Sequence, residues 1–168
     1  HLADFFKLAF QVIDALGEVH QRQVIHKDIN PSNIVYNSMT GQAKIIDFGL
    51  STRLPRETLT RIIPTGMDGT MAYISPEQTG RMNRVVDHRS DFYSLGVTFY
   101  ELLTGKLPFE EKQTLSLLHS HLAKQARPLH EVNPQIPVAL SDLVMKLMAK
   151  NPEDRYQSAF GLKSDILE

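Results

Sequence analysis

The apolar residues of the first twenty positions recur at the spacing of an amphipathic helix. Phe5, Val12 and Leu16 fall on one side of such a helix, and Lys7 falls on the opposite side. We therefore expect a helix over residues 3–20 that packs its apolar face against a core and leaves its polar face in solvent.

A second helix is expected from Asp91 to Thr104, where apolar residues occupy almost every position. A helix that is apolar on nearly all sides is normally buried, so this segment should lie at the centre of the fold. Gly105 and Pro108 supply the signals that end it. Further helices are expected at about 114–123, 138–149 and 158–167, joined by connections that contain proline.

Two short apolar stretches, Asn33–Tyr36 and Ala43–Ile46, surround a segment whose composition favours a turn. This pattern predicts a small β-hairpin. The stretch from Ser51 to Asp68 has little periodicity, so it should be an irregular loop, and loops of that length are often functional. The predicted fold is mainly α, a helical bundle with one small β-hairpin at its edge, and 168 residues suffice for one folded unit.

Composition removes several classes of function. The chain has no cysteine, which excludes disulfides, thiolate zinc sites and thiol catalysis and suits the cytosol. Eighteen basic residues nearly balance nineteen acidic ones, so nothing in the net charge indicates a nucleic acid partner. No apolar run approaches the ~20 residues that span a bilayer, so we expect a soluble domain. His119 and His121 are two positions apart on an expected helix and would point in different directions, which disfavours a shared metal ion.

The strongest chemical signal is the run His-Lys-Asp-Ile-Asn-Pro-Ser-Asn at residues 26–33, followed by Asp47-Phe48-Gly49. Asp and Asn after a short strand often bind their own backbone, so either motif alone would be weak evidence. The order and spacing of the two motifs together resemble the catalytic loop and the magnesium-binding motif of protein kinases.

This resemblance implies a role for each residue. Asp28 would orient the attacking hydroxyl and accept its proton, and Asn33 with Asp47 would supply oxygen ligands to Mg²⁺. Phe48 would pack into the lobe and set the direction of Asp47, while Gly49 would give the backbone freedom to switch. The implied cofactors are ATP and Mg²⁺, and the implied substrate is a protein.

Further motifs carry the same resemblance. Residues 69–77 are similar to the end of a kinase activation loop, with Ser75 where alanine is common, and Thr70 would hydrogen-bond near Asp28 as part of the catalytic set. Residues 91–96 are similar to the start of the family's buried helix.

In that family the aspartate matched by Asp91 binds backbone amides of the catalytic loop. The arginine matched by Arg155 pairs with the glutamate matched by Glu77. Residues 103–109 resemble the link after the central helix, a packing motif. Residues 1–168 are thus expected to form the C-terminal, mainly helical lobe of a protein kinase catalytic domain, with the hairpin at the active-site edge.

Two positions depart from the pattern of serine/threonine kinases. Asn30 stands where a lysine usually steadies the transferred phosphate, and Lys27 stands where an arginine usually precedes the catalytic aspartate. We also find no glycine-rich phosphate loop, strand lysine and helical glutamate. The N-terminal lobe is therefore expected to be absent, and the isolated chain to be inactive.

The motif at residues 74–84, together with residues 26–33, resembles a bacterial subgroup in which a kinase-like region precedes ATPase, sensor and histidine kinase domains. Such domains and the missing lobe are expected partners. The favoured hypothesis is a serine/threonine protein kinase acting in signal transduction. The alternatives are a pseudokinase that serves as a regulatory binding module, and a small-molecule phosphotransferase. Candidate phosphorylation sites, which could equally be solvated loop threonines, are Thr58, Thr60 and Thr65.

Overall fold

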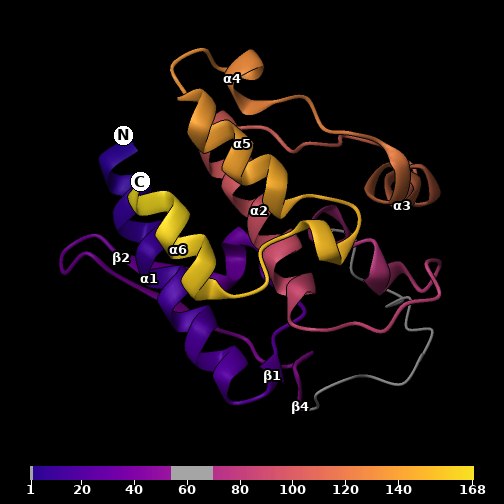
Figure 1. Ribbon diagram of the computed structural model, residues 1–168, viewed down its shortest axis with the longest axis horizontal. Coiled ribbons are helices and arrows are strands. Elements are labelled where there is room, and N and C mark those ends of the chain that lie inside the picture. Colours follow the sequence, from indigo (N-terminus) through magenta and orange to yellow (C-terminus); the bar gives the residue numbers. More distant parts are fainter. Residues whose placement is uncertain (1, 54–69) are drawn as a thin grey trace.

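The computed structural model describes residues 2–53 and 70–168 of the chain, apart from the side chains of Arg53 and Thr70. Helices dominate these ranges, as expected for a kinase-like C-terminal lobe (Figure 1). The α-helices are α1 (Leu2–Gln21), α2 (Arg89–Thr104), α3 (Thr114–Ala123), α4 (Leu129–Val132), α5 (Val138–Leu147) and α6 (Ala159–Leu167). Short 3₁₀ turns are η1 (Pro31–Asn33), η2 (Thr70–Tyr73), η3 (Glu77–Thr79) and η4 (Pro152–Asp154).

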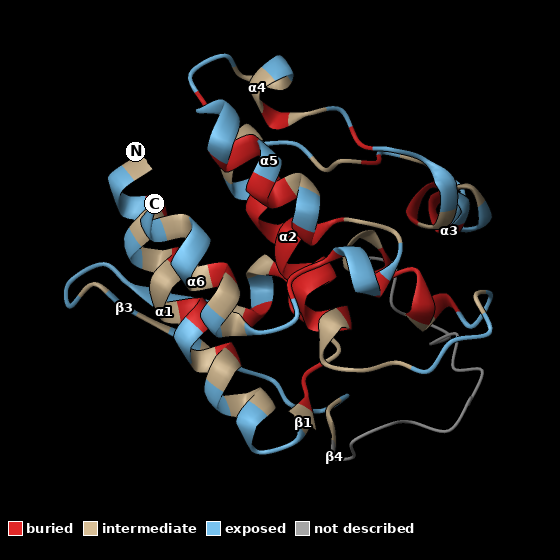
Figure 2. Ribbon diagram, viewed as in Figure 1, coloured by how far each residue is buried: buried red, intermediate tan, exposed pale blue. Residues whose placement is uncertain are grey.

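The centre of the fold is α2, which is buried along most of its length and packs against α5 (Figure 2). Gly96 allows this approach, because a Cβ atom added there would lie only 2.7 Å from the Cβ of Leu147. Gly105 ends the helix with a φ of 72°, and its amide bonds the carbonyl oxygen of Glu101 at 2.7 Å. The prediction of a buried central helix is confirmed, although α2 begins at Arg89, two residues before Asp91.

The amphipathic helix predicted near the start of the chain is α1, and it lies beside α6, so that both ends of the chain meet on one side (Figure 1). The buried residues of α1 are Phe5, Ala9, Val12, Ile13 and Leu16. Gly17 brings α1 close to Ala159, and Lys163 of α6 forms an ion pair with Asp14 at 2.6 Å. The first residue of α6 follows Ser158, whose hydroxyl accepts a hydrogen bond from the amide of Gly161.

The predicted hairpin consists of β2 (Ile34–Asn37) and β3 (Gln42–Ile45), which pair antiparallel with Ile34 opposite Ile45. Gln11 of α1 holds the hairpin against the helix: its Nε2 donates to the carbonyl of Gly41, and its Oε1 accepts from the amide of Ala43, both at 2.9 Å. The hairpin therefore has a fixed position on the side of α1.

A second ladder was not predicted. Strand β1 (Val24–Ile25) pairs antiparallel with β4 (Thr52–Arg53), so the stretch expected to be irregular from Ser51 onward begins with two ladder residues. Strands of two residues are too short to carry an alternating pattern. The ladder brings together the two ends of the segment between β1 and β4, and this segment carries both predicted chemical motifs.

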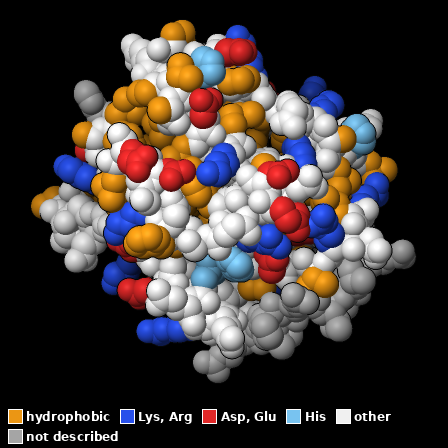
Figure 3. Space-filling model, in the orientation of Figure 1, with side chains coloured by type: hydrophobic (Ala, Val, Ile, Leu, Met, Phe, Trp, Pro, Cys, Tyr) orange, Lys and Arg blue, Asp and Glu red, His pale blue; other side chains and the backbone are white. Residues whose placement is uncertain are grey.

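The described helices include none that is both long enough and apolar enough to cross a bilayer. On the face seen in Figure 3, acidic and basic side chains are intermingled, in keeping with the nearly balanced charge of the chain.

Candidate active site

The predicted catalytic loop follows β1, and its side chains organise its own backbone. Asn30 precedes η1, and its Oδ1 accepts a hydrogen bond from the amide of Ser32 at 3.0 Å, while Pro31 occupies the first position of the turn. This cap is typical of asparagine before a helical turn and of proline at its start. The loop sequence thus specifies a turn that carries Asn33 back toward Asp28.

The carboxylate of Asp28 is held by two side-chain amides. Nδ2 of Asn30 donates to its Oδ1, and Nδ2 of Asn33 donates to its Oδ2, both at 2.9 Å. Partial burial raises the pKa of Asp28, while the hydrogen bonds from Asn33 and Asn30 lower it, as does His26. Nearby Asp47 raises the pKa further. A carboxylate with a fixed direction and a raised pKa is suited to accept a proton.

The end of β3 places Asp47 next to the catalytic loop. The amide of Ile46 donates to the backbone carbonyl of Asn33 at 2.9 Å, so the two segments are joined at this point. Asp47 is exposed, has a φ of 60°, and accepts a hydrogen bond from the amide of Gly49 at 3.1 Å. A Cβ atom at Gly49 would come within 3.1 Å of the same carboxylate oxygen, so this approach favours glycine.

The atoms available at this edge fit a hard cation. Asn33 uses its Nδ2 for Asp28, which leaves its Oδ1 as a ligand atom, and Asp47 offers an exposed carboxylate. Oxygen atoms of this kind are the protein ligands that Mg²⁺ prefers, with the remaining positions filled by water and phosphate. Among the described residues, no group of three or more His, Asp or Glu could hold a metal ion by itself.

Phe48 lies differently from the expectation. Its ring contacts the ring of His26 edge to face, with centroids 4.7 Å apart, but 43% of its surface remains exposed. It is therefore only partly packed into the lobe. Its contact with His26 still links the Asp-Phe-Gly turn to the catalytic loop.

Asp91 holds the backbone of the catalytic loop, as the sequence predicted. Its Oδ2 accepts the amide of His26 at 2.9 Å, and its Oδ1 accepts the amide of Lys27 at 2.7 Å. Lys27 has a φ of 68°, a left-handed conformation that costs a non-glycine residue on the order of 1–3 kcal/mol. Two adjacent amides can converge on one carboxylate because the backbone turns in this way.

His20 was not identified from the sequence, yet it completes the contacts of Asp91. Its Nε2 lies 2.8 Å from Oδ2 of Asp91, and its ring packs against Phe92 with centroids 5.3 Å apart. His20 belongs to the last turn of α1, where it fits the helical pattern and carries no separate signal. Only the fold brings it to a residue 71 positions later.

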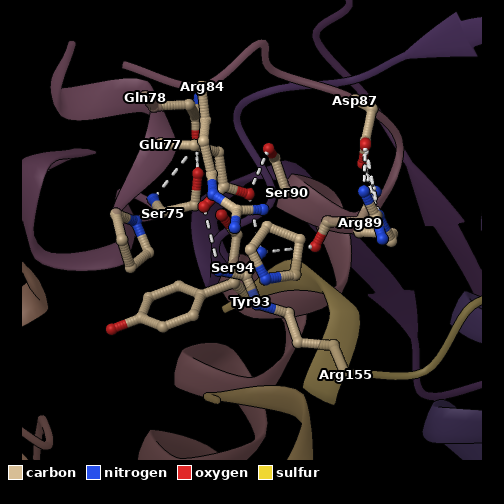
Figure 4. Close-up of polar contacts among 12 residues, drawn as sticks. Ser75, Glu77, Gln78, Arg84, Asp87, Arg89, Ser90, Tyr93, Ser94 and Arg155 are labelled. Atoms are coloured by element: carbon tan, nitrogen blue, oxygen red, sulfur yellow. Dashed lines mark hydrogen bonds and ion pairs between the residues drawn. The ribbon is translucent and has the colours of Figure 1, made fainter. Parts of the chain in front are cut away.

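The predicted pair of Glu77 and Arg155 is present and buried (Figure 4). Two guanidinium nitrogens lie 2.6 and 2.9 Å from the two carboxylate oxygens. Ser90 also donates to Glu77 at 2.6 Å, and Nε of Arg155 donates to the carbonyl of Ala149 at 2.7 Å. This network ties η3, the start of α2 and the segment after α5 together.

Other predicted site residues lie outside what the structure describes. Thr70 begins η2, but its side chain is not described, so its expected bond near Asp28 stays a prediction. The threonines at 58, 60 and 65 fall in the range 54–69, which is outside the described residues.

The sequence matches the protein kinase domain family over residues 3–165. The hybrid signal transduction histidine kinase G of Dictyostelium discoideum is 42% identical over an alignment that covers 96% of this chain and 7% of that protein. The serine/threonine-protein kinase PrkC of Bacillus subtilis is 33% identical, with coverage of 99% and 25%. The serine/threonine-protein kinase PknB of Mycobacterium leprae is 38% identical, with coverage of 91% and 24%. The chain therefore spans a quarter or less of the length of these relatives.

Proposed function

Because this chain belongs to the protein kinase family, we propose that it supplies the catalytic loop for transfer of phosphate from ATP to serine or threonine hydroxyls of a protein in signal transduction. The observation that carries the proposal is the carboxylate of Asp28. Two amides fix both of its oxygens, and Asp47 lies close enough to raise its pKa. The similarity to PrkC and PknB supports serine and threonine as the acceptors.

Asp28 would orient the attacking hydroxyl and accept its proton. Asn33 contributes in two ways, since its Nδ2 fixes Oδ2 of Asp28 and its Oδ1 is left for the metal. Asp47 would be the second protein ligand. Mg²⁺ bound between Asn33 and Asp47 would neutralise charge on the phosphates of ATP.

Asn30 sets a limit on the rate. It supplies a neutral amide to Asp28 where serine/threonine kinases usually carry a cation that steadies the phosphate. The loss of one electrostatic contact of this type lowers a rate without abolishing the chemistry. We therefore expect slow transfer. We also expect no appreciable transfer by residues 1–168 alone, because they include no glycine-rich phosphate loop.

The test is Asp28→Asn in the natural protein that carries this sequence. The substitution keeps the shape of the side chain and removes the base, so transfer to protein should fall by roughly 10²–10⁴-fold while binding of Mg²⁺ and ATP is retained. Asp47→Asn should instead weaken Mg²⁺-dependent binding of ATP. Asp142→Asn, at an exposed position of α5, is the matched control and should change neither quantity.

Two alternatives have their own outcomes. The uncharged Asn30 favours a regulatory module, and Mg²⁺-dependent nucleotide binding with no transfer by the natural protein would select it. Phosphorylation of sugars or amino alcohols, with none of protein, would select a small-molecule phosphotransferase. The similarity to a hybrid histidine kinase supports a place among further signalling domains, whether the chain is a protein kinase or a regulatory module.

A further inference from the structure

The side chain of Gln78 connects η3 to the catalytic loop. Its Nε2 donates to the carbonyl oxygen of Lys27 at 2.9 Å, and its Oε1 lies 3.1 Å from the amide and 2.9 Å from the hydroxyl of Ser75. A backbone amide can only donate, so the oxygen of Gln78 must face Ser75. Nε2 is then the atom that faces Lys27, and the orientation of the amide is settled by its partners.

The backbone of Lys27 is held at both of its polar groups. Its N–H donates to Asp91, and its C=O accepts from Gln78. Its φ of 68° is a left-handed conformation that is unfavourable for a residue with a Cβ atom. Such a conformation persists only where its surroundings enforce it. Asp91 and Gln78 are two such restraints.

We propose that Gln78 is a positioning residue for phosphoryl transfer: by holding the Lys27 carbonyl, it fixes the peptide bond that leads into Asp28. The proposal rests on the proposed role of Asp28 as the base. Rotation of this peptide would turn the Asp28 carboxylate away from Asn30 and Asn33. Gln78 thus acts through the loop backbone, without touching the reacting atoms.

Ser75 gives the contact its direction. Alanine, the common residue at this position in the resembling motif, has no hydroxyl, whereas Ser75 is buried and directs its hydroxyl to Oε1 of Gln78 (Figure 4). The carboxamide of Gln78 therefore couples Ser75, which precedes η3, to the catalytic loop. A rearrangement that moved Gln78 away from the catalytic loop would release the restraint on Lys27.

The test compares Gln78→Glu and Gln78→Ala in the natural protein. Glutamate keeps the size of the side chain but presents an oxygen to the Lys27 carbonyl, and alanine removes the contact. Loss of one such hydrogen bond should lower kcat about tenfold or more, with the KM for ATP nearly unchanged. Amide hydrogen exchange of residues 26–29 should rise, while that of residues 95–100 in α2 stays the same. A fall in protection throughout α2 would indicate general destabilisation and would overturn the positioning role.

A second pair of variants isolates the backbone conformation. Lys27→Gly removes the penalty of the left-handed conformation, and Lys27→Ala removes the same side chain but keeps the penalty. Gln78→Ala should therefore cost about tenfold in kcat beside Ala at position 27, and clearly less beside Gly. Equal costs in the two backgrounds would refute the proposal.

Ser75→Ala provides a milder perturbation that keeps the fold. It should raise the amide exchange of residues 26–29 less than Gln78→Ala does. If exchange of these residues stayed the same in all of the variants, the coupling would be refuted. The exchange measurement needs no activity. If the natural protein transfers no phosphate at all, the proposed function fails, whereas the restraint on Lys27 is still decided by the protection of residues 26–29.

Discussion

The guanidinium of Arg155 and the carboxylate of Glu77 face each other in two hydrogen bonds although they are 78 positions apart in the sequence. Their side chains are 0% and 1% exposed. The cost of removing both charges from water offsets much of the attraction within such an ion pair, but either partner is costly when it is left alone. The pair therefore makes the junction of η3, α2 and the segment after α5 sensitive to single substitutions.

Glu77→Gln should lower the free energy of unfolding by about 3–5 kcal/mol, because it leaves the charge of Arg155 buried without compensation. Urea unfolding followed by circular dichroism would measure this. The control is Glu153→Gln, which breaks the surface pair with Arg84 and should leave the urea midpoint nearly unchanged. Equal shifts for the two variants would show that burial of the pair is unimportant.

Mild acid should destabilise the protein through His121. Burial and the neighbouring Lys150 lower the pKa of His121 to about 4, whereas a histidine in an unfolded chain has a pKa of about 6.5. Between about pH 6.5 and pH 4 the unfolded state therefore binds a proton at His121 that the folded state does not bind. The stability that depends on neutral His121 is complete above about pH 6.5 and is lost as the pH falls toward 4, by roughly 3 kcal/mol in all.

Urea unfolding between pH 4 and pH 7 would show this loss. His121→Gln keeps a hydrogen-bonding group near the hydroxyl of Tyr93, removes the titration, and should flatten the profile. His119→Gln, at an exposed position of the same helix, should leave the profile as it is. A profile that stays steep in the His121 variant would assign the acid sensitivity to other groups.

Gly96→Ala should destabilise the protein by about 1–3 kcal/mol. The new methyl group would lie 2.7 Å from the Cβ of Leu147 and 2.8 Å from the Cγ of Met148, so α2 and α5 would have to separate. Thermal unfolding would measure the effect. Gly161→Ala in α6, where the added Cβ would make an ordinary contact at 3.5 Å, should be neutral or slightly stabilising.

Substitutions of Asn30 should move the pH dependence of transfer in opposite directions. The base must be ionised, so kcat falls as the pH drops through the pKa of Asp28. Asn30→Ala removes a hydrogen bond that lowers this pKa, so the acid limb should move to higher pH. Asn30→Lys places a cation beside the carboxylate, so the limb should move to lower pH. The lysine should also raise kcat by up to about tenfold, because it restores a positive charge near the phosphate. Shifts of the acid limb in the same direction for both variants would contradict the assignment of Asp28 as the base.

The sequence predicted the elements that have strong periodicity or clear end signals. The amphipathic pattern of α1, the apolar run of α2 with Gly105 after it, and the stretch from Thr114 to Ala123 each predicted a helix that the structure contains. The hairpin was predicted one residue away from its observed strands. These segments are defined by local patterns, so a single sequence carries them.

Other features depend on residues that meet only in the folded chain. The ladder of β1 and β4 joins two-residue strands, and the contact of His20 with Asp91 crosses 71 positions. Motif resemblance predicted Asp91 and the Glu77–Arg155 pair, because the family pattern includes those residues. It did not predict Gln78, whose partner is a backbone carbonyl and leaves no pattern in the side chains.

The residues that restrain the backbone of Lys27 are synthesised after Lys27 itself. Asp91 follows Lys27 by 64 positions. At a translation rate of 5–20 residues per second, roughly 3–13 s pass between the synthesis of Lys27 and that of the carboxylate that binds its amide. Gln78, 51 positions after Lys27, is made earlier in that interval. Until then the left-handed turn at Lys27 has neither Asp91 nor Gln78 to enforce it, and the loop can hold only conformations that its own residues favour. The predicted catalytic loop is made early, and the restraints on its backbone come from residues that are made later.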